Sequence, residues 1–271
     1  MSGGKQGAMR RMPAVFGPSS GPRQVPEPGL AWDNARSPLR DSSYAHFVVP
    51  AAALQPLLPA GCTVREPACL AIEFSELRAI DWLAGRGYTM LSVRIPVHYE
   101  GPGGPLDGWF QPVIWENLTE PILSGREELG WNKIYAELPP ARQAPQGRVH
   151  EAQWQGFRFL RLTLSGLEPL SPTLPPATHV LHHKYIPATG DWGRADVDYL
   201  TVTPPGNSQA QVLAHASGTA TLEWHRPTWQ DMPTQHHIVG ALCDLPLGAL
   251  LAAGCYSTRG GKDLSDQYRL A

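Results

Sequence analysis

Residues 119–136, TEPILSGREELGWNKIYA, predict a short helix that ends at a glycine and leads into a strand with a single lysine. Thr119 can cap the start of the helix, and Pro121 suits the first turn, where a missing backbone N–H costs nothing. Gly130 can adopt the left-handed conformation that ends many helices. The chain then enters a strand at Lys133.

The surroundings of Lys133 suggest a reactive amine. Its neighbours Trp131, Ile134 and Tyr135 are apolar or aromatic, and no acidic residue stands beside it in sequence. Burial among such groups disfavours the charged form of lysine and lowers its pKa. A neutral amine is a nucleophile whose natural partner is the carbonyl group of a ketone or aldehyde. The plainer alternative is a solvated lysine at the surface.

On both sides of this stretch the chain reads mainly as strands separated by turns. Alternation of apolar and polar residues is clearest in 157–165, FRFLRLTLS. Further strands are expected at 44–49, 68–77, 88–99, 107–116, 148–154, 179–186, 196–203, 211–224 and 255–258, and helices at 50–58 and 244–254. Strands and helices do not alternate as in βαβ units. We therefore expect a mainly β protein, an antiparallel barrel or cone closed or nearly closed, wide enough for one small ligand.

Composition narrows the class of protein. The chain has 271 residues, of which 42% are hydrophobic, and a net charge of −2 without a long run of one sign. This charge argues against nucleic acid or an anionic membrane as partner. Residues 1–30 form a Gly/Pro-rich arm, and 31–271 are expected to form one domain. No apolar stretch approaches the roughly 20 residues of a membrane span, and no signal peptide is visible, so a cytoplasmic protein with reduced cysteines is expected.

Three blocks of sequence resemble the acetoacetate decarboxylase superfamily, from about Arg40 to the C-terminus. The most specific block has Glu120-Pro121, then Gly125-Arg126-Glu127, then Lys133 eight residues after the glycine. The other two blocks are Gly87-Tyr-Thr leading to Ile95-Pro96-Val97, and Asp244-Leu-Pro.

The resemblance implies a cone-shaped antiparallel β-barrel with an apolar lumen, and a lysine that forms a Schiff base with a keto acid. On this basis Lys133 is the Schiff-base lysine, Glu73 an active-site glutamate and Arg40 a group near the substrate carboxylate. Such an enzyme needs no cofactor and no metal, and the family usually forms homo-oligomers. The lysine of acetoacetate decarboxylase is itself a standard example of an amine that is activated by desolvation.

Two departures from the decarboxylase pattern change the expected reaction. Ile134 stands where decarboxylases have a second lysine, and Met90 stands where they have a second glutamate. Relatives in the superfamily perform aldol, retro-aldol or dehydration chemistry through the same lysine, and the departures favour that group. A β-keto acid decarboxylase and a non-catalytic ligand-binding barrel are the alternatives.

Several other residues have both a functional and a structural interpretation. Arg40 can bind a carboxylate or pair with Asp41 or another acid. Glu73 can face the lumen or solvent, since alternation does not say which face is inside. The remaining expectations are as follows: Trp131, Met90 and Tyr256 line the pocket, Arg126 and Glu127 brace the lysine loop, Glu128 is solvated, and His46 and His98 point into the lumen. The adjacent pairs His182-His183 and His236-His237 are expected on strands, where neighbours face opposite ways, so a metal site is not expected.

Overall fold

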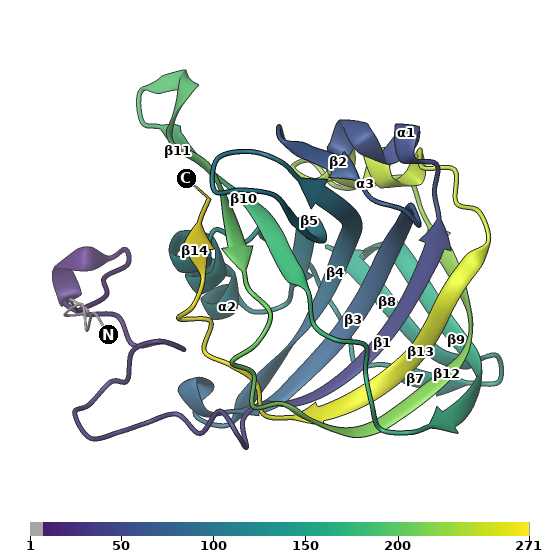
Figure 1. Cartoon of the computed structure of the whole chain (residues 1–271), viewed down its shortest axis with the longest axis horizontal. Coiled ribbons are helices and arrows are strands. Elements are labelled where there is room, and N and C mark those ends of the chain that lie inside the picture. The colour runs from purple at the N-terminus through teal and green to yellow at the C-terminus, as the bar shows by residue number, and fades with distance from the viewer. Residues whose placement is uncertain (1–7, 271) are drawn as a thin grey trace.

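The computed structural model describes residues 8–270 and shows one strongly curved sheet that carries nearly the whole chain (Figure 1). Its strands are β1 (Leu39–Val48), β2 (Cys62–Val64), β3 (Cys69–Ile80), β4 (Arg86–Tyr99), β5 (Leu106–Glu116), β6 (Lys133–Tyr135), β7 (Arg142–Ala144), β8 (Gly147–Trp154), β9 (Phe157–Leu170), β10 (His179–Ala188), β11 (Asp191–Thr203), β12 (Gln211–Trp224), β13 (Leu250–Arg259) and β14 (Tyr268–Arg269). The mainly β prediction is therefore confirmed.

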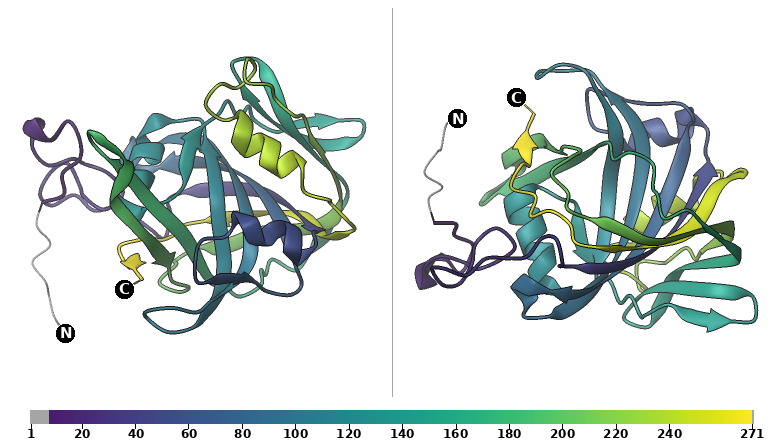
Figure 2. Two further views of the ribbon diagram at one scale, coloured as in Figure 1. Left: turned by 90° about the horizontal axis from the view of Figure 1, so that it is seen from above. Right: turned by 60° about the horizontal axis from the view of Figure 1, so that its bottom comes forward.

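The helices are few and short. They are η1 (Ala14–Phe16), α1 (Ala51–Leu54), η2 (Gln55–Leu57), η3 (Asp81–Leu83), α2 (Thr119–Ser124), the π-helical turn η4 (Gly125–Leu129) and α3 (His236–Cys243). Figure 1 and Figure 2 show α1 and α3 together at one end of the curved sheet, while α2 stands at its side next to β14. No helix in the described part of the chain is long and apolar enough to span a membrane.

The sheet is mixed and open, which corrects the expected closed antiparallel barrel. The strand order runs β14-β11-β10-β5-β4-β3-β1-β13-β12-β9-β8-β7, so the path has two ends. Most neighbours are antiparallel, but β5 pairs in parallel with both β10 and β6. A parallel neighbour requires a connection that carries the chain back to the starting end of the strand, and α2 with η4 provides it between β5 and β6.

The two faces of the sheet carry different residues. One face holds the main hydrophobic core, with fully buried side chains such as Ile72 of β3, Leu91 of β4 and Leu162 of β9. The opposite face of β3, β4 and β5 carries a smaller cluster that includes Leu77 and Met90. Because side chains alternate along a strand, the same strands supply both faces, and the smaller cluster lies on the face of the lysine.

The predicted helix at 244–254 is wrong. The helix α3 comes earlier and ends at Asp244, and the apolar residues that follow form β13, which pairs with β1 and β12. A short apolar run fits a buried strand as well as a helix, so its period alone does not decide. The pair His236-His237 consequently lies in α3 rather than on a strand.

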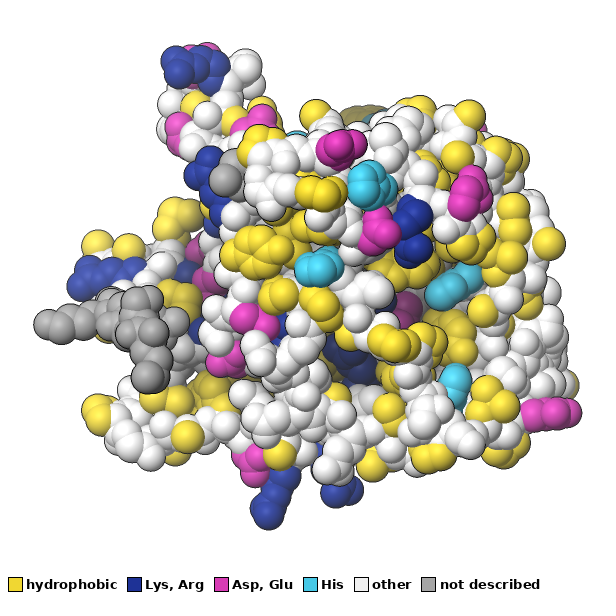
Figure 3. All heavy atoms as spheres, viewed as in Figure 1, with side chains coloured by type: hydrophobic (Ala, Val, Ile, Leu, Met, Phe, Trp, Pro, Cys, Tyr) yellow, Lys and Arg dark blue, Asp and Glu magenta, His cyan; other side chains and the backbone are white. Residues whose placement is uncertain are grey.

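The described part of the N-terminal arm is irregular, forms a loop that contains η1, and lies outside the sheet at the side where α2 and β14 stand (Figure 1). The face drawn in Figure 3 mixes hydrophobic, basic and acidic side chains, and no large area of one charge sign is visible on it.

Candidate active site

The amine of Lys133 is buried at the start of β6. The residue is 4% exposed, and β6 pairs in parallel with β5 so that Lys133 stands opposite Ile114. Its Nζ lies 2.8 Å from Oε1 of Glu116, donates to the carbonyl oxygen of Pro121 at 3.0 Å, and lies 4.9 Å from the ring centre of Trp131. The amine is therefore held by one carboxyl group, one backbone carbonyl and one aromatic ring.

The helical segment before β6 shapes this arrangement. A Cβ atom on Gly125 would lie 2.4 Å from Cδ of Lys133, so the lysine side chain passes directly over this glycine. Gly130 has the predicted left-handed conformation, with φ at 76°, and ends the π-helical turn. Arg126 donates from Nη1 to the carbonyl oxygen of Lys133 at 2.9 Å and thereby fixes the backbone of β6. Single π-turns of this kind are frequent at functional sites.

Burial disfavours the charged forms of both Lys133 and Glu116. Burial lowers the pKa of Lys133, Glu116 opposes this effect, and the net pKa lies below its ordinary value. Burial raises the pKa of Glu116, Lys133 opposes that effect, and the net pKa lies above its ordinary value. Both shifts disfavour the charged forms, so the neutral amine is more accessible than in a solvated lysine.

A cavity of about 460 Å³ opens next to the amine. Five residues predicted for the site line it: Lys133, Arg40, Met90, Trp131 and Tyr256. These residues come from β6, β1, β4, the turn before β6, and β13. The fold thus brings together positions that lie in widely separated parts of the sequence.

Glu73 is also predicted for the site, but it lies outside the lining of this cavity. It accepts a hydrogen bond from Tyr256 Oη at 3.1 Å and one from Ser75 Oγ at 3.1 Å, and Arg94 Nη2 lies 3.5 Å away. Burial acts to raise the pKa of Glu73, but Arg94, Arg40 and the two hydroxyl donors outweigh it, and the pKa is lowered. Glu73 is therefore an ionised acceptor that holds the phenol of Tyr256, and it does not line the lysine cavity.

Arg40 faces the cavity and Asp41 does not. Asp41 is bound by Arg78 and accepts a 2.5 Å hydrogen bond from Ser257, so it does not serve as the partner of Arg40. Burial acts to lower the pKa of Arg40, but Tyr256 and other nearby groups outweigh it, and the pKa is raised. A charged guanidinium at the cavity wall can receive a carboxylate.

Of the two bracing residues, Glu127 contributes through its backbone. Its carbonyl oxygen accepts from Lys184 Nζ at 2.6 Å, which ties the π-helical turn to β10. The expectation that Glu128 is solvated is wrong, since its side chain is 9% exposed and is bound by Arg23. The prediction for His98 is also wrong, because it is paired with Asp107 at 2.8 Å and its side chain is 42% exposed.

Sequence reasoning missed three residues near the lysine. Glu116 ends β5, and its contact with Lys133 depends on the β5–β6 pairing. Tyr88 lines the cavity, and burial raises the pKa of its phenol. His182 is fully buried and stacks on Trp131 with ring centres 4.9 Å apart. Burial drives the pKa of His182 well below its ordinary value, and within the described chain neither ring nitrogen has a hydrogen-bond partner.

Comparison with known protein families identifies the family of this chain. A model of the family described as acetoacetate decarboxylase (ADC) matches residues 11–262. The chain belongs to the acetoacetate decarboxylase family. The resemblance drawn from the three sequence blocks is thus confirmed. A search among curated proteins finds no match.

Solved structures of the ADC fold superpose on most of the chain. The acetoacetate decarboxylase of Legionella pneumophila has 19% identity and a TM-score of 0.63, over 88% of this chain and 92% of its own. An acetoacetate decarboxylase-like enzyme of Sphingomonas wittichii RW1 has 19% identity and a TM-score of 0.59, over 86% and 91%. The enduracididine biosynthesis enzyme MppR, complexed with pyruvate, has 17% identity and a TM-score of 0.58, over 84% and 90%.

Ile134 and Met90, the two departures from the decarboxylase pattern, line different cavities in this ADC-family chain. Ile134 lines a separate cavity of about 420 Å³, because its side chain points away from that of Lys133. Met90 faces the lysine cavity, and Glu116 stands directly opposite it on the neighbouring strand. The carboxyl group near the amine is therefore supplied by β5 rather than β4.

Proposed function

We propose that this chain is a cofactor-free enzyme that forms a Schiff base between Lys133 and a keto acid. The observation that carries the proposal is the buried Lys133 amine, with its lowered pKa and its contact with Glu116, at the wall of a cavity that also contains Arg40. The neutral amine attacks the keto carbon, and the carbinolamine loses water to give an iminium. Arg40 binds the substrate carboxylate.

The reaction we favour is of the aldolase or dehydratase type and takes place at the carbon atoms α and β to the iminium. In the retro-aldol direction, a base removes the β-hydroxyl proton and the bond between the α and β carbons breaks. Its electron pair moves to the iminium, which gives an enamine and an aldehyde. In dehydration, a base removes an α proton and the β-hydroxyl group leaves as water after protonation. Both reactions need a group that takes and returns protons, and Glu116 lies at hydrogen-bond distance from the reacting nitrogen.

β-Keto acid decarboxylation is the second candidate, and the family membership favours it. In that reaction the carboxylate leaves as CO2, and its electron pair forms the enamine. A guanidinium that binds the carboxylate stabilises it as an anion, so Arg40 supports chemistry in which the carboxylate is retained. A structure of MppR complexed with the condensation product of pyruvate and imidazole 4-carboxaldehyde offers a parallel for that chemistry on the same fold.

Borohydride trapping tests the proposal. The protein is incubated with pyruvate, acetoacetate or an aldehyde plus pyruvate, reduced with borohydride, and digested for mass spectrometry. We expect a reduced adduct on Lys133 in the wild type and none on the Lys133→Ala variant. CO2 release from acetoacetate would favour decarboxylation, and formation of an aldol product or its enone would favour the first reaction.

A ligand-binding protein without catalysis is the remaining alternative. It predicts reversible keto acid binding that persists in Lys133→Ala and gives no adduct in the wild type. Turnover retained by Lys133→Ala would refute the Schiff-base mechanism in either catalytic form.

A further inference from the structure

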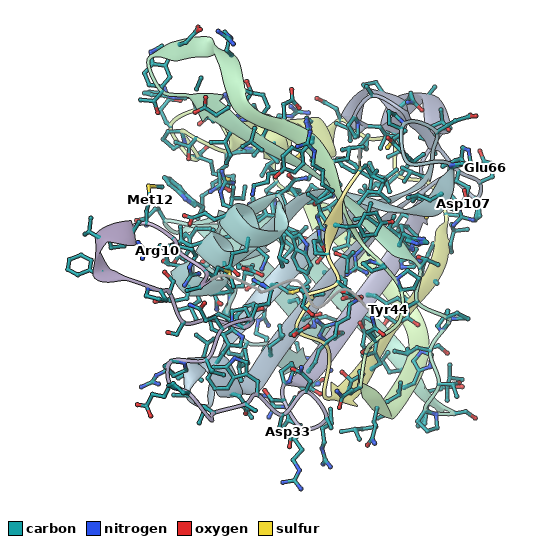
Figure 4. All side chains as sticks on the ribbon, turned by 60° about the vertical axis from the view of Figure 1, so that its left-hand side comes forward. Arg10, Met12, Asp33, Tyr44, Glu66 and Asp107 are labelled. Carbon is teal, nitrogen blue, oxygen red and sulfur yellow. The ribbon has the colours of Figure 1, made fainter. Side chains whose placement is uncertain are left out.

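The N-terminal arm forms part of the wall of the lysine cavity. Pro22, Arg23, Trp32 and Asn34 line the same cavity of about 460 Å³ as Lys133. In Figure 4 the labelled Arg10 and Met12 mark the outer loop of the arm, and Asp33 marks its return to the lower edge of the sheet. The arm therefore crosses the side of the cavity on its way into β1.

The arm is held there by buried contacts. The Arg23 side chain is 9% exposed, binds Glu128 of the π-helical turn, and donates from Nη1 to the carbonyl oxygen of Asp263 at 2.9 Å. Arg11 lies 3.4 Å from the same Glu128. Trp32 donates from Nε1 to the carbonyl oxygen of Gly21 at 2.9 Å, which fixes its indole ring. The buried Arg23–Glu128 ion pair joins the arm to the helical segment that precedes Lys133. The arm is therefore a fixed part of the cavity wall.

Part of the cavity wall is apolar and aromatic. Members of the smaller hydrophobic cluster line the cavity, and they are Leu77, Ile80, Met90, Trp82, Tyr88 and Trp131. Trp32 of the arm adds one more ring to the same cavity. Aromatic side chains placed around a cavity favour flat apolar groups, because ring pairs attract beyond simple burial of area.

The size of the cavity exceeds that of a small keto acid. A water molecule occupies about 30 Å³ of liquid, so 460 Å³ corresponds to about 15 water volumes. Acetoacetate and 2-oxobutanoate, C4 keto acids with few heavy atoms, would leave most of that space unfilled. A keto acid with an added phenyl group fills more of it.

We infer that Trp32 and the arm around it form a distal subsite, which binds an aromatic or similarly large apolar group carried by the keto acid. This inference rests on the proposed Schiff-base function and names the substrate class of that site. Arg40 and Lys133 hold the carboxylate and the carbonyl carbon, and the apolar tail lies against Trp32 and Trp82. Trp32 is then a residue that determines specificity, and Arg23 is a positioning residue that holds the arm in place.

Matched keto acids test the inference. Borohydride labelling of Lys133 is measured against the concentration of 2-oxobutanoate and of 2-oxo-4-phenylbutanoate, which differ by the phenyl group. In the wild type we expect half-maximal labelling at an about tenfold lower concentration of the phenyl compound, as burial of one ring provides. Trp32→Ala should remove most of this preference by raising the concentration of the phenyl compound that gives half-maximal labelling.

Two further variants keep the test independent of folding defects. Arg23→Gln should reduce the preference by releasing the arm, while Trp229→Ala, whose ring is 60% exposed and lies outside the cavity lining, should preserve it. Thermal melting checks that each variant is folded. Equal labelling by both keto acids in the wild type would overturn the inference, as would a Trp32→Ala variant with unchanged preference. Labelling by neither compound would instead count against the proposed function itself.

Discussion

Gly125→Ala should disable the lysine while leaving the backbone undisturbed. Gly125 has helical torsions, with φ at −67° and ψ at −46°, which alanine adopts readily. The added Cβ would lie 2.4 Å from Cδ, 2.6 Å from Cε and 2.9 Å from Nζ of Lys133. Unbonded carbon atoms prefer about 3.5 Å, so the end of the lysine side chain has to move by about 1 Å.

This displacement acts on the contacts that define the site. The amine would leave its 2.8 Å position beside Glu116 and its 3.0 Å contact with Pro121. A misplacement of about 1 Å in a reacting group costs roughly 100-fold in rate. Stability should change little, by about 1 kcal/mol or less, because the better helix propensity of alanine offsets part of the crowding. The loss of function is therefore expected without a comparable loss of fold.

The initial rate of borohydride-trapped adduct formation with 2-oxobutanoate measures the effect, and thermal melting measures stability. Gly193→Ala is the matched control, because a Cβ there meets no atom within 4 Å. It should trap at the wild-type rate. A folded Gly125→Ala protein that also labels Lys133 at the wild-type rate would show that the position of the amine beside Glu116 does not control its reactivity.

Three further outcomes are expected. Glu116→Gln should move the acidic limb of the pH profile of adduct formation to lower pH, because Glu116 raises the pKa of Lys133 against the effect of burial; a limb that moves upward would contradict this. The wild-type protein should lose stability as pH falls from about 7 to about 5. The reason is that the lowered pKa keeps His182 neutral in the folded state, whereas His182 takes up a proton in the unfolded state. In chemical denaturation, His182→Phe should reduce this loss of unfolding free energy by about 2 kcal/mol. At the tip of the arm, Met12, Val15 and Phe16 are 78%, 89% and 84% exposed, so we propose that the tip packs on a second copy of the chain. Size-exclusion chromatography should show an oligomer that Phe16→Ser weakens, and a wild-type monomer would refute this.

Local sequence is sufficient to predict secondary structure where a residue type or pattern is compatible with only one conformation. Gly130 is predicted to end the helix because few other residues adopt a positive φ, and the structure has it there at 76°. The alternating run that begins at Phe157 predicts a strand, because an alternating pattern buries one face of a sheet, and that strand is β9. The apolar run after Asp244 carries no such constraint, and its assignment to a helix is the error.

Two properties of this protein follow from its linear sequence: the family and the mainly β class. They rest on motif spacing and on alternation. The charges that meet the lysine are a property of the folded chain instead. Glu116 reaches it through the parallel pairing of β5 and β6, and Arg23 reaches its cavity because the arm crosses the side of that cavity. Contacts of this kind depend on strand order and on the path of the chain in space, which the local period of a sequence does not specify.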